Sequence, residues 1–336
     1  MRIGLALPHY DTSYQGEPAA WDRILTAART AEESGFDSVW VSDHFFLDWG
    51  KYGGPDDRQG AFECWTLLSA IAARTKTVRL GSLALCNDFR NPALLAKMAA
   101  SLDLLSGGRL ELGLGAGWYE PEYQAAGIDF DEAGARIARL GEAGQIVRRL
   151  LDGEELTFEG RHYTIDGAVC RPVRDGGRPL VWFGGKGDYL IKTAVRHADG
   201  WNFSWLGSLD TYRDRLASAE KACAEEGRDL ATLHRSVGAY VMAGRDEADA
   251  ARRFERLAER TPPGVLRGPN GAPAVSWDEF KAANVAGSVN EVIDRLGAIK
   301  DLGVEEVVMT LGTLPFQLGD LEDVELVGQE IAPAVR

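Results

Sequence analysis

Cysteine and histidine are scarce in this sequence, and neither is grouped as a metal site requires. The chain has 336 residues and four cysteines, at positions 64, 86, 170 and 223. No C-x-x-C pair occurs, which argues against structural zinc. The five histidines, at positions 9, 44, 162, 197 and 234, form no His-x-His pair, which disfavours a metal-dependent hydrolase. We therefore predict no metal, and the scattered thiols are typical of a reducing cytoplasm.

Basic residues and long apolar runs are also lacking. Lysine and arginine number 37 against 51 acidic residues, a net charge of −14, whereas nucleic-acid binding needs clustered positive charge. No apolar run approaches the roughly 18 residues of a membrane span. The N-terminal stretch MRIGLALPHY turns polar too soon for a signal peptide. We expect a cytoplasmic protein that binds neither nucleic acid nor membrane, although a local pocket can still hold an anionic small molecule.

The sequence instead offers a regular alternation of short apolar runs and helical patterns. This alternation favours a parallel β/α architecture, and a closed (β/α)8 barrel takes about 250 residues. We predict one TIM-barrel domain over 1–336, with a hairpin insertion at 152–178 and a lid-like insertion at 261–286. The expected strands are 2–7, 36–42, 78–85, 109–115, 180–184, 199–204, 235–243 and 305–312, and the clearest helices are 19–34, 92–106, 133–151 and 209–226.

The alternative is an open, doubly wound sheet with a dinucleotide site. In that fold the glycine-rich turn follows the first strand. Here the stretch GLGAGW follows the fourth predicted strand, and its third glycine comes one position too early for G-x-G-x-x-G. The position of the turn therefore favours the barrel.

Two glycine-rich turns are the strongest candidates for ligand binding. GLGAGW, which ends at Trp118, and FGGKGD, which spans 183–188, each follow a predicted strand and precede a helix. Glycine lets backbone amides converge, and a helix N-terminus favours anions, so both turns suit a phosphate. The alternative is that the glycines only let the chain turn tightly. Neither a G-x-S-x-G elbow nor a Walker motif competes with them.

His44 is the main candidate for proton transfer. It follows the second predicted strand, at the barrel end where active sites gather, and histidine titrates near neutral pH. A structural histidine paired with Asp43 or with a backbone carbonyl is the alternative. Aromatic residues are dense at the same end, and such a mouth can stack a flat ring; they are Phe45, Phe46, Trp49, Trp118, Tyr119, Trp182, Trp201 and Trp205.

Three blocks together resemble a known family. SDHF, RLGSLALCNDFRNPALLAKMAASLDLLSGGRLELGLGAGWYEPEY and PLVWFGGKGDYLIKTAVRHADGWN are similar to the luciferase-like monooxygenase superfamily, and most similar to its branch that uses the deazaflavin F420. The resemblance covers nearly the whole chain. It implies a barrel with insertions and a cofactor in its mouth, with the cofactor phosphate on the two glycine turns.

The resemblance also implies roles for single residues. The implied cofactor-binding positions are Leu83, Ala84, Asn87, Gly115, Ala116, Gly117, Trp118, Phe183, Gly184, Gly185 and Lys186. His44 would face the cofactor ring, and a non-proline cis peptide bond is implied near Leu83-Ala84. Deazaflavin-dependent sugar-phosphate dehydrogenases carry an acidic glutamate directly after the glycine turn. This chain has Trp118 there, with Glu120 two positions later as a second catalytic candidate, so sugar-phosphate oxidation is not expected.

We therefore predict an F420-dependent oxidoreductase that transfers a hydride between the cofactor and a small organic substrate. A monooxygenase using reduced FMN, of the bacterial luciferase and alkanesulfonate monooxygenase type, is the alternative. A barrel that binds a flavin without turnover is a third possibility from a different class. The family also implies a homodimer formed by helices near the second and third strands.

Overall fold

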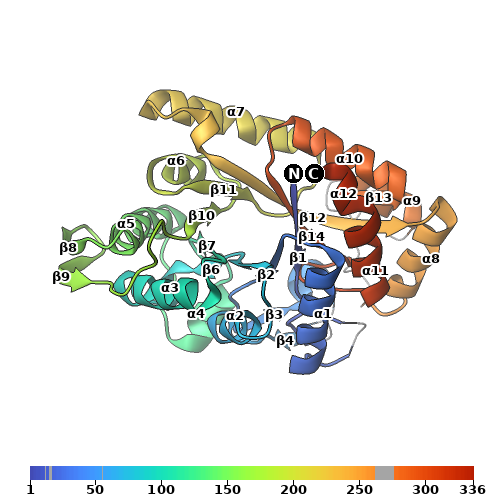
Figure 1. Cartoon of the computed structure of the whole chain (residues 1–336), viewed down its shortest axis with the longest axis horizontal. Coiled ribbons are helices and arrows are strands. Elements are labelled where there is room, and N and C mark those ends of the chain that lie inside the picture. The colour runs from blue at the N-terminus through green and yellow to red at the C-terminus, as the bar shows by residue number, and fades with distance from the viewer. Residues whose placement is uncertain (12, 15–16, 55, 262–275) are drawn as a thin grey trace. The chain divides into compact units, whose positions relative to one another are not determined.

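A computed structural model describes the chain as two compact units of parallel strands and covering helices (Figure 1). The first unit contains Met1–Glu63, Phe203–Asp214 and Arg235–Arg336, and the second contains Cys64–Asn202 and Arg215–His234. The described residues are 1–11, 13–14, 17–54, 56–261 and 276–336.

Strand β1 is the central strand of the first unit. It pairs in parallel with β2 on one side and with β14 on the other, and β14 pairs in turn with β12. A further short strand, β13, pairs with the last four residues of β12. These strands are β1 (Arg2–Ala6), β2 (Ser38–Val41), β12 (His234–Gly244), β13 (Val285–Ser288) and β14 (Glu306–Thr310), and a small antiparallel pair is formed by β3 (Phe46–Asp48) and β4 (Arg58–Gly60).

Local sequence signals set the helices of this unit. Gly35 ends α1 in the left-handed region at φ 96°, as expected of a C-terminal glycine. Ser288 and Glu291 form a capping box at the start of α10. The two termini lie side by side in Figure 1, and the Met1 ammonium donates to the Val335 carbonyl at 3.0 Å. The helical segments are α1 (Trp21–Ser34), η1 (Trp49–Tyr52), α8 (Glu247–Ala258), α9 (Trp277–Ala283), α10 (Val289–Asp301), α11 (Leu321–Leu326), η5 (Val327–Ile331) and α12 (Ala332–Val335).

Strand β7 is central in the second unit. It pairs in parallel with β5, β6 and β10, and β10 pairs with β11. The strands are β5 (Arg79–Ser82), β6 (Leu85–Cys86), β7 (Leu110–Gly115), β10 (Leu180–Gly184) and β11 (Gly200–Phe203), and the insertion forms a hairpin of β8 (Glu155–Glu159) and β9 (Thr164–Val169). The helical segments are α2 (Cys64–Ala72), η2 (Asn87–Phe89), α3 (Pro92–Ser106), α4 (Glu120–Ala126), α5 (Ala133–Leu151), α6 (Asp188–His197), η3 (Leu230–Thr232) and α7 (Leu209–Glu226), which begins in the first unit.

Each unit buries one glutamate among its strands. Glu111 accepts hydrogen bonds from Arg79 Nε at 2.5 Å and from Trp182 Nε1 at 2.6 Å. Glu306 of the other unit pairs with Arg2 at 2.8 Å and accepts from Trp40 Nε1 at 3.2 Å. Both glutamates are fully buried. Buried carboxylates need such partners, because an unpaired charge in the interior is costly.

All eight predicted strands are present, with one difference. The run 78–85 was expected to be a single strand, but it forms β5 and then β6, separated by a cis peptide bond between Leu83 and Ala84. The predicted insertion 152–178 contains the antiparallel pair β8 and β9. Part of the predicted lid-like insertion, residues 262–275, lies outside the described residues, and its end forms α9 and the start of β13.

Candidate functional site

The two predicted glycine turns follow neighbouring strands of the second unit. Parallel pairing places Phe183 of β10 opposite Leu114 of β7, so Gly184 and Gly115 end their strands at the same level (Figure 1). On the other side of β7, Cys86 of β6 stands opposite Gly115. The three predicted cofactor-binding segments, 83–87, 115–118 and 183–186, are therefore brought together in one unit.

The cis bond implied by the family resemblance is present at Leu83-Ala84. It lies beside the first glycine turn, because a Cβ placed on Gly115 would sit 3.4 Å from the Ala84 Cβ. Ser82, the residue before Leu83, links β5 to β7. Its hydroxyl donates to the Gly113 carbonyl and accepts from the Gly113 amide, both at 2.9 Å. The Ser82 side chain thus ties the end of β5, directly before the cis bond, to β7.

Gly117 occupies a place that no other residue can fill without movement. Its φ is 75°, and a Cβ there would meet the Tyr123 hydroxyl at 1.7 Å. That hydroxyl donates to Asp88 Oδ2 at 3.1 Å and lies 3.0 Å from Cys86 Sγ. Burial, followed by Cys86 and Asp88, raises the pKa of Tyr123, so the hydroxyl keeps its proton and remains a donor.

Asp88 anchors this group to the rest of the unit. Its Oδ1 accepts from Arg139 Nη1 at 2.9 Å, an ion pair in which the aspartate side chain is 3% exposed. The neighbouring Asn87, a predicted cofactor-binding residue, donates from Nδ2 to the Tyr163 hydroxyl at 3.1 Å. Side chains from η2, α4, α5 and the hairpin therefore form a hydrogen-bond network beside the first glycine turn. The sequence did not indicate this network.

The second turn leads directly into helix α6. Gly185 has a φ of 148° and donates its amide to the Asn202 carbonyl oxygen at 3.0 Å, while its own carbonyl accepts from Trp201 Nε1 at 2.8 Å. No side chain caps the first amides of α6, and such amides attract anions. Burial lowers the pKa of the adjacent Lys186, and an anion beside it would offset that effect.

His44 follows β2 in the first unit and is half-buried. Its ring centroid lies 6.3 Å from that of Tyr10, and the preceding Asp43 is buried. The second catalytic candidate, Glu120, lies elsewhere. It is exposed in the first turn of α4 and accepts a hydrogen bond from Gln124 Nε2 at 3.0 Å. The exposed position leaves Glu120 the weaker of the two candidates.

A second histidine, His9, is buried beside Tyr10, and both of its ring nitrogens make hydrogen bonds within the protein. Its Nδ1 lies 2.8 Å from the Leu7 carbonyl oxygen and must donate, because a carbonyl only accepts. Complete burial lowers the pKa of His9 to about 4, so the ring is neutral and its Nε2 accepts from the Ser42 hydroxyl at 3.0 Å. Ser42 then accepts from the Tyr10 hydroxyl at 2.5 Å. His9 therefore orders Tyr10 and is unsuited to act as a base at neutral pH.

A row of aromatic rings continues from Tyr10 across the first unit. The ring centroid of Phe316 lies 6.3 Å from that of Tyr10. It lies 5.5 Å from that of Trp205, and these two rings pack edge to face. The ring centroids of Trp205 and Tyr240 are also 5.5 Å apart. Phe316 and Trp205 have φ values of 56° and 52°, which non-glycine residues rarely adopt. Thr310 helps to hold the loop at Phe316, because its hydroxyl donates to the Leu314 carbonyl at 2.7 Å.

Among the described residues, no three His, Cys, Asp or Glu side chains gather closely enough to hold a metal ion. None of the helices in the same part of the chain has the length and apolar character needed to cross a bilayer.

Comparison with known proteins places the chain. The sequence profile described as luciferase-like monooxygenase matches residues 1–306. This chain belongs to that family. Among curated members, an F420-dependent glucose-6-phosphate dehydrogenase of Amycolatopsis mediterranei is 34% identical over 231 residues, which is 68% of this chain and 67% of that one. For the Gordonia bronchialis enzyme of the same name, the chain spans 62% of the relative's length.

The chain is also similar, over a longer stretch, to a relative with a different named activity. The F420-dependent hydroxymycolic acid dehydrogenase of Mycobacterium tuberculosis is 29% identical over 322 residues, covering 94% of this chain and 81% of that one. A solved F420-dependent secondary alcohol dehydrogenase, in complex with an F420-acetone adduct, superimposes with a TM-score of 0.77 at 23% identity, over 100% of this chain and 99% of that one. These likenesses confirm the predicted family and the (β/α)8 barrel fold.

Proposed function

We propose that this chain is an F420-dependent oxidoreductase that interconverts a hydroxyl and a carbonyl group on a small organic substrate. The family members reported above carry F420 in their names, and each name denotes a dehydrogenase. This agrees with the oxidoreductase class and the cofactor predicted from the sequence. The observation that carries the proposal is the convergence of three backbone segments on adjacent strands of the second unit.

The residues of that unit fit an anionic cofactor. We assign the phosphate to the backbone at Gly115, Ala116 and Gly117, with Trp118 beside it, and to Phe183, Gly184, Gly185 and Lys186. The amides at the start of α6 have no side-chain cap, and the Lys186 ammonium adds positive charge in a chain of net charge −14. Leu83, Ala84 and Asn87 supply the third segment. When bound, F420 supplies the hydride acceptor or donor.

We assign proton transfer to His44. The two histidines near the ends of β1 and β2 differ in burial, because His9 is fully buried and His44 is half-buried. Complete burial lowers the pKa of His9 to about 4, so the half-buried His44 is the better group to take a proton from a substrate hydroxyl. Glu120 is retained as the second candidate. General acid–base catalysis of this kind contributes about 10²–10⁴-fold to the rate.

The test is a parallel titration of the protein with oxidised F420 and with FMN, followed by tryptophan fluorescence and calorimetry. We expect F420 to bind at micromolar concentration. His44→Ala should retain that affinity and lose about 10²–10⁴-fold in turnover, whereas Glu120→Gln, at an exposed site, should change turnover less. Binding of FMN without any response to F420 would point to the FMN monooxygenase alternative. Full turnover by His44→Ala would remove the role assigned to this residue.

A further inference from the structure

The ring of Tyr10 packs against the side chain to which we assign proton transfer. Its centroid lies 6.3 Å from that of the His44 ring, at an interplanar angle of 42°, which is within the usual range of aromatic contacts. Tyr10 is 6% exposed, whereas His44 is half-buried. The buried Tyr10 ring therefore stands on one side of the imidazole and restricts the orientations that His44 can take.

A hydrogen bond also links Tyr10 to the backbone segment that carries His44. The Tyr10 hydroxyl lies 2.5 Å from the hydroxyl of Ser42, two residues before His44. The direction of this bond is fixed by His9, because its Nδ1 donates to the Leu7 carbonyl and its Nε2 accepts the Ser42 proton. Ser42 has no second proton to give, so Tyr10 is the donor. Tyr10 thus contacts both the His44 ring and the segment that leads to it.

Tyr10 is itself held from several directions. Its backbone amide donates to Ser13 Oγ at 3.1 Å, and it forms an antiparallel bridge with Ala61. Its ring centroid lies 4.5 Å from that of His9 and 6.3 Å from that of Phe316. A side chain that is locked by packing and hydrogen bonds can hold a neighbouring catalytic group in a productive orientation.

We propose that Tyr10 is a positioning residue, which holds the His44 imidazole in place to accept the proton of a substrate hydroxyl. The assignment rests on the proposed function. Tyr10 does not take this proton itself, because it is buried and its hydroxyl is engaged by Ser42. A misplaced catalytic group slows the chemical step without weakening the binding of substrate or cofactor. Loss of the Tyr10 ring should therefore lower kcat and leave KM and the Kd for F420 unchanged.

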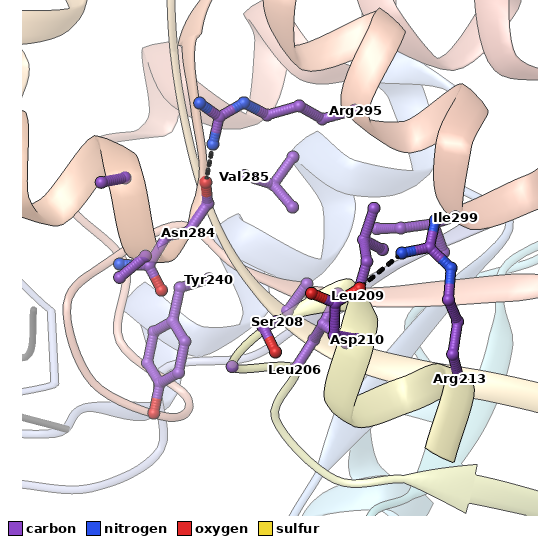
Figure 2. A pocket seen from close by; sticks show the side chains of 14 residues that line it. Leu206, Ser208, Leu209, Asp210, Arg213, Tyr240, Asn284, Val285, Arg295 and Ile299 are labelled. Carbon is purple, nitrogen blue, oxygen red and sulfur yellow. Dashed lines mark hydrogen bonds and ion pairs between the residues drawn. The ribbon is translucent and has the colours of Figure 1, made fainter. Parts of the chain in front are cut away.

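The far end of the aromatic row offers a matched control. Tyr240 contacts Trp205, and the row continues through Phe316 before it reaches Tyr10. Figure 2 shows Tyr240 at the wall of a cavity of about 450 Å³, which has both polar and apolar lining. Tyr240→Leu therefore removes a tyrosine ring from the same row at a place two rings away from Tyr10.

The first test needs neither cofactor nor substrate. NMR relaxation of isotope-labelled histidine rings measures how tightly the His44 imidazole is held, and His44→Ala assigns its signal. We expect a high order parameter for this ring in the wild type, in Tyr10→Phe and in Tyr240→Leu, and a low one in Tyr10→Leu, which lacks the adjacent aromatic ring. Tyr10→Met replaces Tyr10→Leu if that variant does not fold. An unchanged order parameter in Tyr10→Leu, or an equal loss in Tyr240→Leu, overturns the assignment.

The second test measures turnover of 2-propanol with oxidised F420. Tyr10→Leu should lose about tenfold or more in kcat, with KM and the Kd for F420 unchanged. Tyr10→Phe keeps the ring and should lose at most about threefold, and Tyr240→Leu should keep the kcat of the wild type. A loss in Tyr10→Leu that appears only in KM, or an equal loss of kcat in Tyr240→Leu, contradicts a positioning role. If the wild type neither binds F420 nor turns over, the proposed function fails, and the cofactor-free test still decides whether Tyr10 orients His44.

Discussion

Replacing His9 should change how the stability of this protein depends on pH. In the folded chain the ring is completely buried, and its pKa is lowered to about 4 from an ordinary value of 6.5. In the unfolded chain the ring is solvated and takes a proton below about pH 6.5. The unfolded state therefore binds more protons between these two values, and the free energy of unfolding must fall as the pH falls through this window.

The size of the effect follows from the two pKa values. Each unit by which the pKa differs between the folded and unfolded states corresponds to about 1.4 kcal/mol in the free energy of unfolding. The whole difference for His9 therefore corresponds to about 3 kcal/mol. Between about pH 7 and pH 4.5, the part that titrates is roughly 2 kcal/mol. Above pH 6.5 the contribution of His9 is constant, because the ring is neutral in both states.

The assay is urea unfolding of the wild type and of His9→Gln at several values between pH 4.5 and pH 7. His9→Gln should be less stable at neutral pH, because the hydrogen bonds to Leu7 and Ser42 are altered, but its stability should fall by roughly 2 kcal/mol less on acidification. Tyr10→Phe is the matched control, since it removes the outer hydrogen bond and keeps the buried ring. Its pH dependence should parallel that of the wild type. Parallel curves for wild type and His9→Gln would refute a neutral, buried His9.

Two further predictions concern the second unit. Tyr123→Phe should weaken F420 binding about tenfold or more, because the hydrogen bond from the hydroxyl next to Gly117 to Asp88 is lost. Tyr189→Phe, which alters an exposed ring, is the control and should leave the affinity unchanged. Equal Kd values for the two variants in a fluorescence titration would contradict this prediction. Glu111→Ala should lower the free energy of unfolding by about 1–3 kcal/mol, since the buried Trp182 Nε1 loses its acceptor and Arg79 loses its ion pair, while exposed Glu155→Ala changes it by less than about 0.5 kcal/mol. Equal urea midpoints for these two variants would exclude a structural role for Glu111.

The strands were predictable because each is a short apolar run between turn-forming residues. The predicted helix 92–106 matches α3 residue for residue, since Pro92 near its start and the glycines after Ser106 mark its limits. The break between β5 and β6 was not predicted from the apolar pattern, because Leu83 and Ala84 continue the apolar run after Gly81 and Ser82. That break was expected only from the resemblance to the family.

The positions of the candidate site residues in the fold were predictable where these residues follow strands, and not where they depend on contacts distant in sequence. The two glycine turns could be placed at one end of the sheet because they end parallel strands. Tyr123 and Arg139 could not be assigned, since they lie 35 and 51 residues from Asp88 in the sequence. The difference between His9 and His44 was equally hidden, because both follow predicted strands and only the packed structure buries one of them.

The net charge of −14 is compatible with an anionic cofactor because charges act locally. At physiological ionic strength, exposed charges are largely screened beyond about 8 Å, so carboxylates far from the glycine turns contribute little. The field at the second turn comes from the uncapped amides of α6 and from Lys186, whose pKa is lowered by burial. A phosphate placed there would raise this pKa again, so the anion and the ammonium would stabilise each other. The local backbone, and not the overall charge, therefore decides whether the second unit can hold the cofactor.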